Sequence, residues 1–173
     1  MMSDEELYLK CKKGDTEAFR NLYEKYSKSL FNYIYRIIGD YELSEDIFHE
    51  TFLRMLTKSF VPRAKLSTWL YKIATNLCYK AFNKRKRESN KNLDLIIDSA
   101  ENPQQALEKK DLMERAKRAV STLPEIHRAV FTLRFYQNRS YEEISQILDI
   151  PEGTVKSRMH YAVRSLRKRF KGR

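Results

Sequence analysis

The chain has 173 residues, which allows one ordinary domain or two small ones and excludes a large multidomain enzyme. Thirty-four Lys and Arg against 23 Asp and Glu give a formal net charge of +11, so nucleic acid is the first partner to consider. Hydrophobic residues make up 42% of the chain, and only four Gly and four Pro are available for hairpin turns. These numbers predict a folded, all-α protein and argue against a fully disordered chain.

The sequence gives no sign of export or of a membrane span. Cys11 and Cys78 lie far apart and form no Cys-x-x-Cys pair, so neither a disulfide framework nor a metal site is indicated. The first ten residues are acidic, and no run approaches the ~20 apolar residues that a membrane span requires. We therefore expect a cytoplasmic protein.

Charge is distributed unevenly along the chain. Residues 63–91 carry a net charge of +8 and residues 126–173 carry +7, whereas the two remaining segments carry −2 each. A solvated helix surface would explain a single basic run. Two separated basic segments, each on a patterned helix, instead favour two binding surfaces.

Amphipathic helices are predicted throughout the first half. Apolar residues at spacings of three and four predict a helix over residues 16–38, which Gly39 ends. Ser44 is the candidate N-cap of a second helix that runs to about residue 57. A third helix is expected from a cap at Ser67 to about residue 87, with a polar face opposite its apolar stripe.

The helical period lapses over residues 88–102, where Ser, Asn and Asp gather. Asn102 and Pro103 then resemble an N-cap followed by a proline in the first turn. We therefore expect two small helical domains, 1–88 and 103–173, joined by a flexible linker at 89–102. Limited proteolysis should cut this linker first.

The second half is predicted to end in a helix-turn-helix. Thr122 and Ser140 each begin a capping box, and the second box opens a short helix that ends at Leu148. A turn then leads into a last helix over about residues 152–170. In this arrangement the second helix lies in the DNA major groove, and its early residues contact base edges. The amides near Thr154 could hold a phosphate at the helix N-terminus.

The last helix has one apolar and one basic face. Its expected buried residues are Val155, Met159, Val163, Leu166 and Phe170. Its expected outward residues are Lys156, Ser157, His160, Tyr161, Arg164 and Lys168.

Three segments of the second half resemble a known family. Residues 123–131 (LPEIHRAVF), 140–144 (SYEEI) and 151–158 (PEGTVKSR) are similar to domain 4 of the extracytoplasmic-function sigma factors of bacterial RNA polymerase. The resemblance implies that the last helix reads the minus-35 promoter element. The implied contacts are Thr154, Lys156, Ser157, Arg158, His160, Tyr161 and Arg164. Tyr161 stands where the family often has Arg.

The third helix combines aromatic and basic side chains, as single-strand binders do, because rings stack on unpaired bases and cations follow the phosphates. Residues 67–76 (STWLYKIATN) resemble the minus-ten helix of the same family. The resemblance implies that the loop at about 61–67 captures a flipped base and that Asn76 recognises the minus-ten strand. The implied residues are Arg63, Lys65, Ser67, Trp69, Lys72, Asn76, Tyr79 and Lys80. Trp69 suits a core position equally well, and Lys80 stands where an Asp is common.

Residues 45–53 (EDIFHETFL) resemble the family's segment that docks on the coiled coil of the largest polymerase subunit. Acidic groups around an apolar stripe suit a basic helical partner. The implied contacts are Asp46, His49 and Glu50, with His49 in place of the usual Gln. The resemblance implies three partners: core polymerase (through this coiled coil and the flap), promoter DNA and an anti-sigma factor. It implies no cofactor and no small-molecule substrate.

Catalytic interpretations find little support. His49-Glu50 begins like a zinc-hydrolase motif, but Leu53 occupies the position of the required second histidine. The stronger alternative is a helix-turn-helix repressor or activator that binds duplex DNA alone, with residues 1–88 as a sensor or dimerisation domain. Promoter-dependent transcription with core polymerase separates that alternative from a sigma factor.

Overall fold

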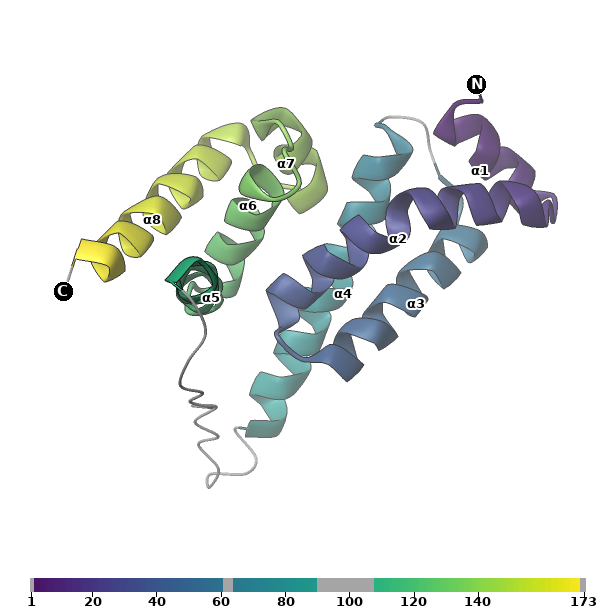
Figure 1. The fold of residues 1–173 in the computed structure, drawn as a ribbon. Coiled ribbons are helices and arrows are strands. Elements are labelled where there is room, and N and C mark those ends of the chain that lie inside the picture. Colours follow the sequence, from purple (N-terminus) through teal and green to yellow (C-terminus); the bar gives the residue numbers. More distant parts are fainter. Residues whose placement is uncertain (1, 61–63, 90–107, 172–173) are drawn as a thin grey trace.

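A computed structural model describes residues 2–60, 64–89 and 108–171, and within these ranges the chain forms eight α-helices and no strand (Figure 1). The helices are α1 (Asp4–Lys12), α2 (Thr16–Ile38), α3 (Tyr41–Thr57), α4 (Leu66–Ser89), α5 (Glu108–Ser121), α6 (Glu125–Phe135), α7 (Tyr141–Leu148) and α8 (Glu152–Lys171). The all-α prediction is confirmed. The expected linker lies almost wholly outside the described residues, as does the expected cap at Asn102.

Two helix boundaries follow the sequence signals. Gly39 ends α2 with φ 76°, a left-handed conformation that glycine adopts without steric cost, and its amide donates to the carbonyl of Tyr35. Ser140 begins α7 with the complete capping box: its hydroxyl accepts from the amide of Glu143, whose carboxylate accepts from the amide of Ser140.

Three predicted caps are wrong. The N-cap of α3 is Asp40, which accepts from the amide of Leu43, whereas Ser44 is buried inside the helix and donates to the carbonyl of Asp40. Helix α4 begins at Leu66, so Ser67 lies within its first turn. Thr122 donates to a carbonyl in the last turn of α5, and the N-cap position of α6 is Pro124, which provides no side-chain hydrogen bond. The hydroxyls of Ser44 and Thr122 are thus satisfied by nearby backbone carbonyls, whereas that of Ser67 accepts from the side chain of Arg139.

Helix α1 is not among the predicted helices. Its signal is a capping box in which Ser3 and Glu6 each bond the other's backbone amide. The helix is short and weakly amphipathic, and it packs against α2 and α4 with Tyr8 and Cys11 buried. The apolar residues of α1 are therefore too few to produce a recognisable helical period in the sequence.

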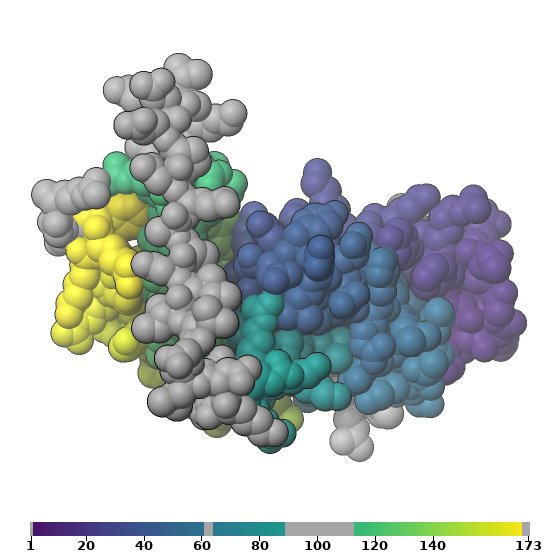
Figure 2. Space-filling view, turned by 90° about the horizontal axis from the view of Figure 1, so that it is seen from below, coloured from purple at the N-terminus to yellow at the C-terminus, as the bar shows by residue number. Residues whose placement is uncertain are grey.

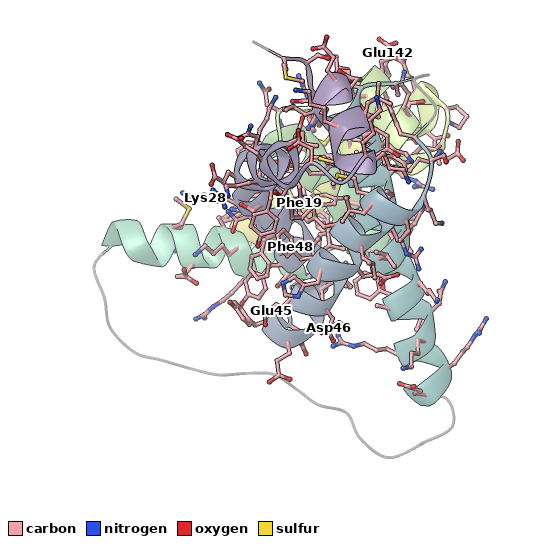
Figure 3. All side chains as sticks on the ribbon, turned by 90° about the vertical axis from the view of Figure 1, so that its right-hand side faces the viewer. Phe19, Lys28, Glu45, Asp46, Phe48 and Glu142 are labelled. Carbon is pink, nitrogen blue, oxygen red and sulfur yellow. The ribbon has the colours of Figure 1, made fainter. Side chains whose placement is uncertain are left out.

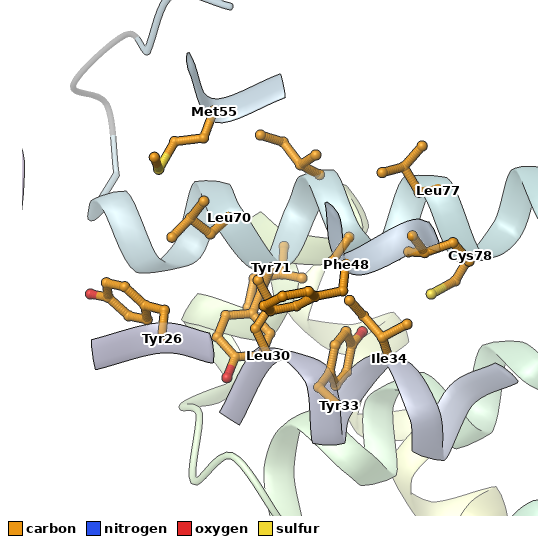
Figure 4. Packing of buried hydrophobic residues seen from close by; sticks show 14 of the residues in the cluster. Tyr26, Leu30, Tyr33, Ile34, Phe48, Met55, Leu70, Tyr71, Leu77 and Cys78 are labelled. Atoms are coloured by element: carbon orange, nitrogen blue, oxygen red, sulfur yellow. The ribbon is translucent and has the colours of Figure 1, made fainter. Parts of the chain in front are cut away.

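The first half is a helical core built around α2. Side chains of α2, α3 and α4 pack together there (Figure 4). The hydroxyl groups of Tyr33 and Thr75 meet at 2.7 Å inside this apolar cluster. Cys78 is fully buried there, and burial raises the pKa of its thiol to about 12. Cys11 is also buried, and burial followed by the charge of Asp15 raises its thiol pKa.

The helix-turn-helix packs on this core. Residues of α6, α7 and α8 belong to the same apolar cluster as α1–α4, with α7 against α4 and α6 against α2. A second, smaller cluster joins α5, α6 and α8 through Val120, Phe131 and Leu166. Figure 2 shows the purple-to-teal first half beside the green-to-yellow second half. We call this packing of the two halves the closed arrangement.

Polar contacts reinforce the closed arrangement. Arg128 donates to the carbonyl of Ile37 at 2.7 Å, across 91 residues of sequence. The hydroxyl of Tyr71 donates to Gln137 at 2.7 Å, and the guanidinium of Arg36 lies 4.1 Å from the ring centroid of Tyr136. The interface between the halves thus combines apolar packing with polar contacts.

Within the described ranges, no helix combines the length and apolarity needed to cross a bilayer.

Candidate nucleic-acid interface

The turn between α7 and α8 is fixed by its own backbone. Asp149 ends α7 in a left-handed conformation, φ 56°, and the hydroxyl of Ser145 donates to the carbonyl of Ile150 at 2.6 Å. The amide of Thr154 donates to the carbonyl of Pro151 at 2.9 Å, so this amide is already engaged and is not the expected free phosphate ligand. The turn therefore orients α8 as a rigid unit on α7.

The outward face of α8 holds the side chains that the sequence places there. Lys156, Ser157, His160 and Arg164 are exposed. Val155 is fully buried, as expected, and Ala162 shares that face, but Phe170 is 45% exposed and is not a core residue. The helix thus presents cations and hydrogen-bonding groups to solvent over its first four turns, as a recognition helix must.

His127 extends this surface and was missed by the sequence analysis. Its ring stacks on that of Tyr161, with centroids 4.1 Å apart, and half-buried Arg158 lies close enough to act on its charge. Burial, followed by the charge of Arg158, lowers the pKa of His127. Nothing in the sequence pairs a residue of α6 with Tyr161, because their proximity depends on helix packing.

One part of the minus-ten face of α4 is open. Asn76 and Lys80 are exposed, and they line a shallow hollow that continues along the helix to Asn83, Lys84 and Arg87. These side chains offer amide and ammonium donors in a row. Such a row suits a phosphate backbone with adjacent bases.

Another part of the same face makes polar contacts with the second half. Arg139 donates to the hydroxyl of Ser67 at 3.1 Å, and Lys72 pairs with Asp149 at 3.4 Å. Lys65 pairs with Glu143 at 3.6 Å. In the closed arrangement these three predicted DNA contacts are therefore occupied by groups around α7.

Tyr79 and Trp69 are half-buried and pack against the apolar core. The hydroxyl of Tyr79 is buried, has no hydrogen-bond partner among the described residues, and its pKa is raised to about 12 by burial. The ring of Trp69 packs against Tyr8 and Phe60, with centroids 5.7 Å and 5.3 Å away. Arg63, the remaining predicted minus-ten residue, lies outside the described residues.

The predicted polymerase-binding segment forms the middle of α3. Asp46 and His49 are exposed, and Glu50 accepts from Arg54 at 2.6 Å one turn along the helix. Figure 3 shows Glu45 and Asp46 at one end of α3 and Phe48 on the side that faces Phe19. Leu53, 55% exposed, continues this surface.

Aromatic residues border the acidic part of α3. The ring of Tyr23 contacts those of Phe48 and Phe52, and Tyr41 contacts Phe31. Tyr23 and Tyr41 are exposed, so the surface combines carboxylates with accessible rings. That combination suits a helical partner with both basic and apolar residues.

Both halves match described protein families. Residues 22–88 match Sigma-70 region 2, and residues 119–168 match Sigma-70 region 4. The chain is 32% identical to the ECF RNA polymerase sigma factor SigW of Bacillus subtilis over an alignment that covers 92% of each chain. It is 33% identical to the ECF RNA polymerase sigma factor SigL of Mycobacterium tuberculosis, with 89% of each chain covered.

Two solved structures share the fold. The sigma factor RpoE of Bartonella quintana, in complex with the anti-sigma factor NepR, superposes with a TM-score of 0.73 at 26% identity, covering 88% of this chain and 96% of that one. The fold of CnrH, in complex with the cytosolic domain of CnrY, gives a TM-score of 0.70 at 17% identity, covering 96% of each chain. From region 2 through region 4, this chain belongs to the extracytoplasmic-function family of RNA polymerase sigma factors.

Proposed function

We propose that this protein binds core RNA polymerase in the cytoplasm, reads the minus-35 element as duplex DNA and holds the minus-ten element as a single strand. The observation that carries the proposal is the presence, on one chain, of region 2 and region 4 sequences with a basic surface on each. The protein acts by binding and contributes no catalytic group of its own. Its working units are residues 1–88 and 103–173, joined by the linker at 89–102.

The polymerase contact is assigned to α3. Asp46, His49 and Glu50 supply polar and acidic groups, while Leu53 and the nearby rings supply apolar area. Charge complementarity with the coiled coil of the largest subunit would set the orientation and speed of docking, and the apolar residues would slow dissociation.

The minus-35 contact is assigned to the exposed face of α8. Lys156, Ser157, His160 and Tyr161 occupy the first turns, where a recognition helix meets base edges. Arg158 and Arg164 would contact phosphates, and each phosphate contact adds to the salt dependence of binding. Thr154 begins this set at the helix N-terminus, with its side chain available and its amide engaged.

The minus-ten contact is assigned to α4 and requires the closed arrangement to open. Asn76 and Lys80 are exposed as they stand, but Ser67 and Lys72 bond groups of the second half. A DNA strand and α7 would therefore compete for the same side chains. Binding of core polymerase to both halves would separate them and free this face.

An anti-sigma factor is the proposed regulator. The RpoE structure that this fold resembles contains one, NepR, bound to the sigma factor. A partner that prefers the closed arrangement would keep Ser67 and Lys72 covered and would reduce the pool of protein that can bind core polymerase.

The deciding experiment is run-off transcription with purified core polymerase and a genomic pool of promoters. Specific products that depend on this protein support the proposal. No product, together with no binding to core polymerase, would remove it and favour an independent repressor or activator.

Two variants separate the two DNA surfaces. His160→Ala should alter minus-35 preference, because losing a base-edge contact typically costs ~1–3 kcal/mol at one position. Asn76→Ala should leave minus-35 preference unchanged but reduce discrimination between pre-melted minus-ten bubbles of different sequence. Equal discrimination by Asn76→Ala and wild type would exclude Asn76 from strand recognition.

A further inference from the structure

Helix α1 is bonded to the end of α3 and to the residues that follow it. The hydroxyl of Tyr8 donates to the carbonyl of Lys58 at 2.8 Å and accepts from the amide of Phe60 at 3.0 Å. The ammonium of Lys12 donates to the carbonyl of Leu56 at 2.8 Å. One face of α1 thus satisfies backbone groups that the end of α3 leaves free.

The same helix also holds the start of α4. The carboxylate of Glu5 accepts from the amide of Leu66 at 3.0 Å, next to the predicted strand contacts Lys65 and Ser67. The rings of Tyr8, Phe60 and Trp69 pack edge-on or tilted, with centroids 5.3–5.7 Å apart. Glu5, Tyr8 and Lys12 are three and four residues apart, so they share one face of α1.

Helix α1 is itself anchored firmly. Its N-terminus carries the capping box of Ser3 and Glu6, and Asp4 pairs with Lys25 at 2.6 Å and with the hydroxyl of Tyr26 on α2. Tyr8 is only 3% exposed. A fixed helix that bonds both Phe60 and Leu66 limits how far the flanks of the intervening segment can move.

We propose that Tyr8 and Glu5 are positioning residues for the minus-ten strand: they hold Phe60 and the N-terminus of α4 so that Lys65 and Ser67 meet an unpaired base of the non-template strand. This inference rests on the proposed function. Extruding a base from the stack costs a few kcal/mol, which a site recovers only when its contacts are already in place. Tyr8 and Glu5 touch no DNA and act through the backbone that they bond.

The test compares two Tyr→Phe variants of the full-length protein in holoenzyme. Tyr8→Phe keeps the ring against Phe60 and Trp69 but removes the hydroxyl that bonds the backbone. Tyr33→Phe removes another buried hydroxyl, which bonds Thr75 in the middle of α4 and none of the residues that Tyr8 and Glu5 bond. Initiation is measured on pre-melted promoters with matched and substituted minus-ten strands, and 2-aminopurine in the strand reports base extrusion.

We expect Tyr8→Phe to reduce the preference for the matched strand by about two- to tenfold, the range that one net hydrogen bond supplies, and to reduce the 2-aminopurine signal. Tyr33→Phe should retain the wild-type preference even if its melting temperature falls equally. Glu5→Ala should behave like Tyr8→Phe, and Glu5→Gln should restore the preference because its amide oxygen can still accept from Leu66.

Wild-type discrimination by Tyr8→Phe and Glu5→Ala would overturn the inference and leave the proposed function intact. Equal losses in Tyr8→Phe and Tyr33→Phe would also overturn it, because a general loss of stability would then explain both. A wild-type holoenzyme that does not distinguish the strands would overturn the proposed minus-ten function, and this inference with it.

Discussion

Arg139 offers the most direct way to weaken the closed arrangement. Its guanidinium donates to Ser67 at 3.1 Å and to Glu143 at 3.4 Å, and it lies 4.7 Å from the ring centroid of Tyr71. The side chain is 16% exposed. Arg139→Met retains most of the apolar stem while removing every charged contact, so α7 and α4 lose their central polar link.

The expected cost follows from these contacts. A partly desolvated cation–π contact contributes about 1 kcal/mol, and a hydrogen bond from a charged donor about 1.5 kcal/mol or more. The buried Nε of Arg139 has no hydrogen-bond partner among the described residues, and its desolvation offsets part of that gain. We therefore expect a net loss of roughly 1–2 kcal/mol, which lowers the ratio of closed to open protein by about 5–30-fold.

The assay is energy transfer between a dye on α3 and a dye on α8 in the free protein. Arg139→Met should lower the mean transfer efficiency and speed proteolysis near residues 89–102. The matched control is Arg134→Met, whose guanidinium lies over the ring of Tyr141 at 5.5 Å and donates to the carbonyl of Arg139, all within the second half. Unchanged transfer in Arg139→Met, or the same change in Arg134→Met, would refute this reasoning.

Three further predictions concern separate features. Asp46→Lys should weaken binding to core polymerase without changing the helical circular dichroism, because the side chain is exposed; unfolding of the variant would instead assign Asp46 a structural role. The pKa of His127 is lowered in the folded state, so the imidazole of the unfolded chain binds a proton at a higher pH than that of the folded protein. The free energy of unfolding should therefore fall as the pH drops below about 6.5. Denaturant titrations should show this loss in wild type but not in His127→Phe. Ser140→Ala should lower the free energy of unfolding by about 1 kcal/mol, with Ser140→Asp near wild type in thermal melts, and equal stability of all three proteins would deny the cap any role.

Local signals in the sequence were sufficient to predict most helices. The spacing of apolar residues identified the long helix that ends at Gly39, because an amphipathic helix and its left-handed cap both depend on neighbouring residues. Ser140 succeeded as a cap for the same reason, since its box partner is three residues away. Ser44 failed because a serine inside a helix can satisfy itself on the preceding turn, which no short pattern distinguishes from a cap.

The contacts between the halves could not be predicted in this way. The bond from Arg128 to Ile37 and the bond from Tyr71 to Gln137 join residues whose spacing carries no periodic signal. They depend on how whole helices pack. The sequence therefore offered Lys72 and Ser67 as candidate contacts on α4, but it contained no indication that residues flanking α7 would bond to them.

The two buried thiols, Cys11 and Cys78, can report local opening of the protein. A buried thiol reacts with a soluble disulfide only while the protein around it is open, so its modification rate measures the population of that opening. Cys11 lies on α1 and Cys78 in the middle of α4, so the two rates report different events: the release of α1 from Lys58, Phe60 and Leu66, and the unpacking of the main core. Labelling the exposed thiol with a reagent and locating the label by mass spectrometry would show which opening is more frequent, without any change to the sequence.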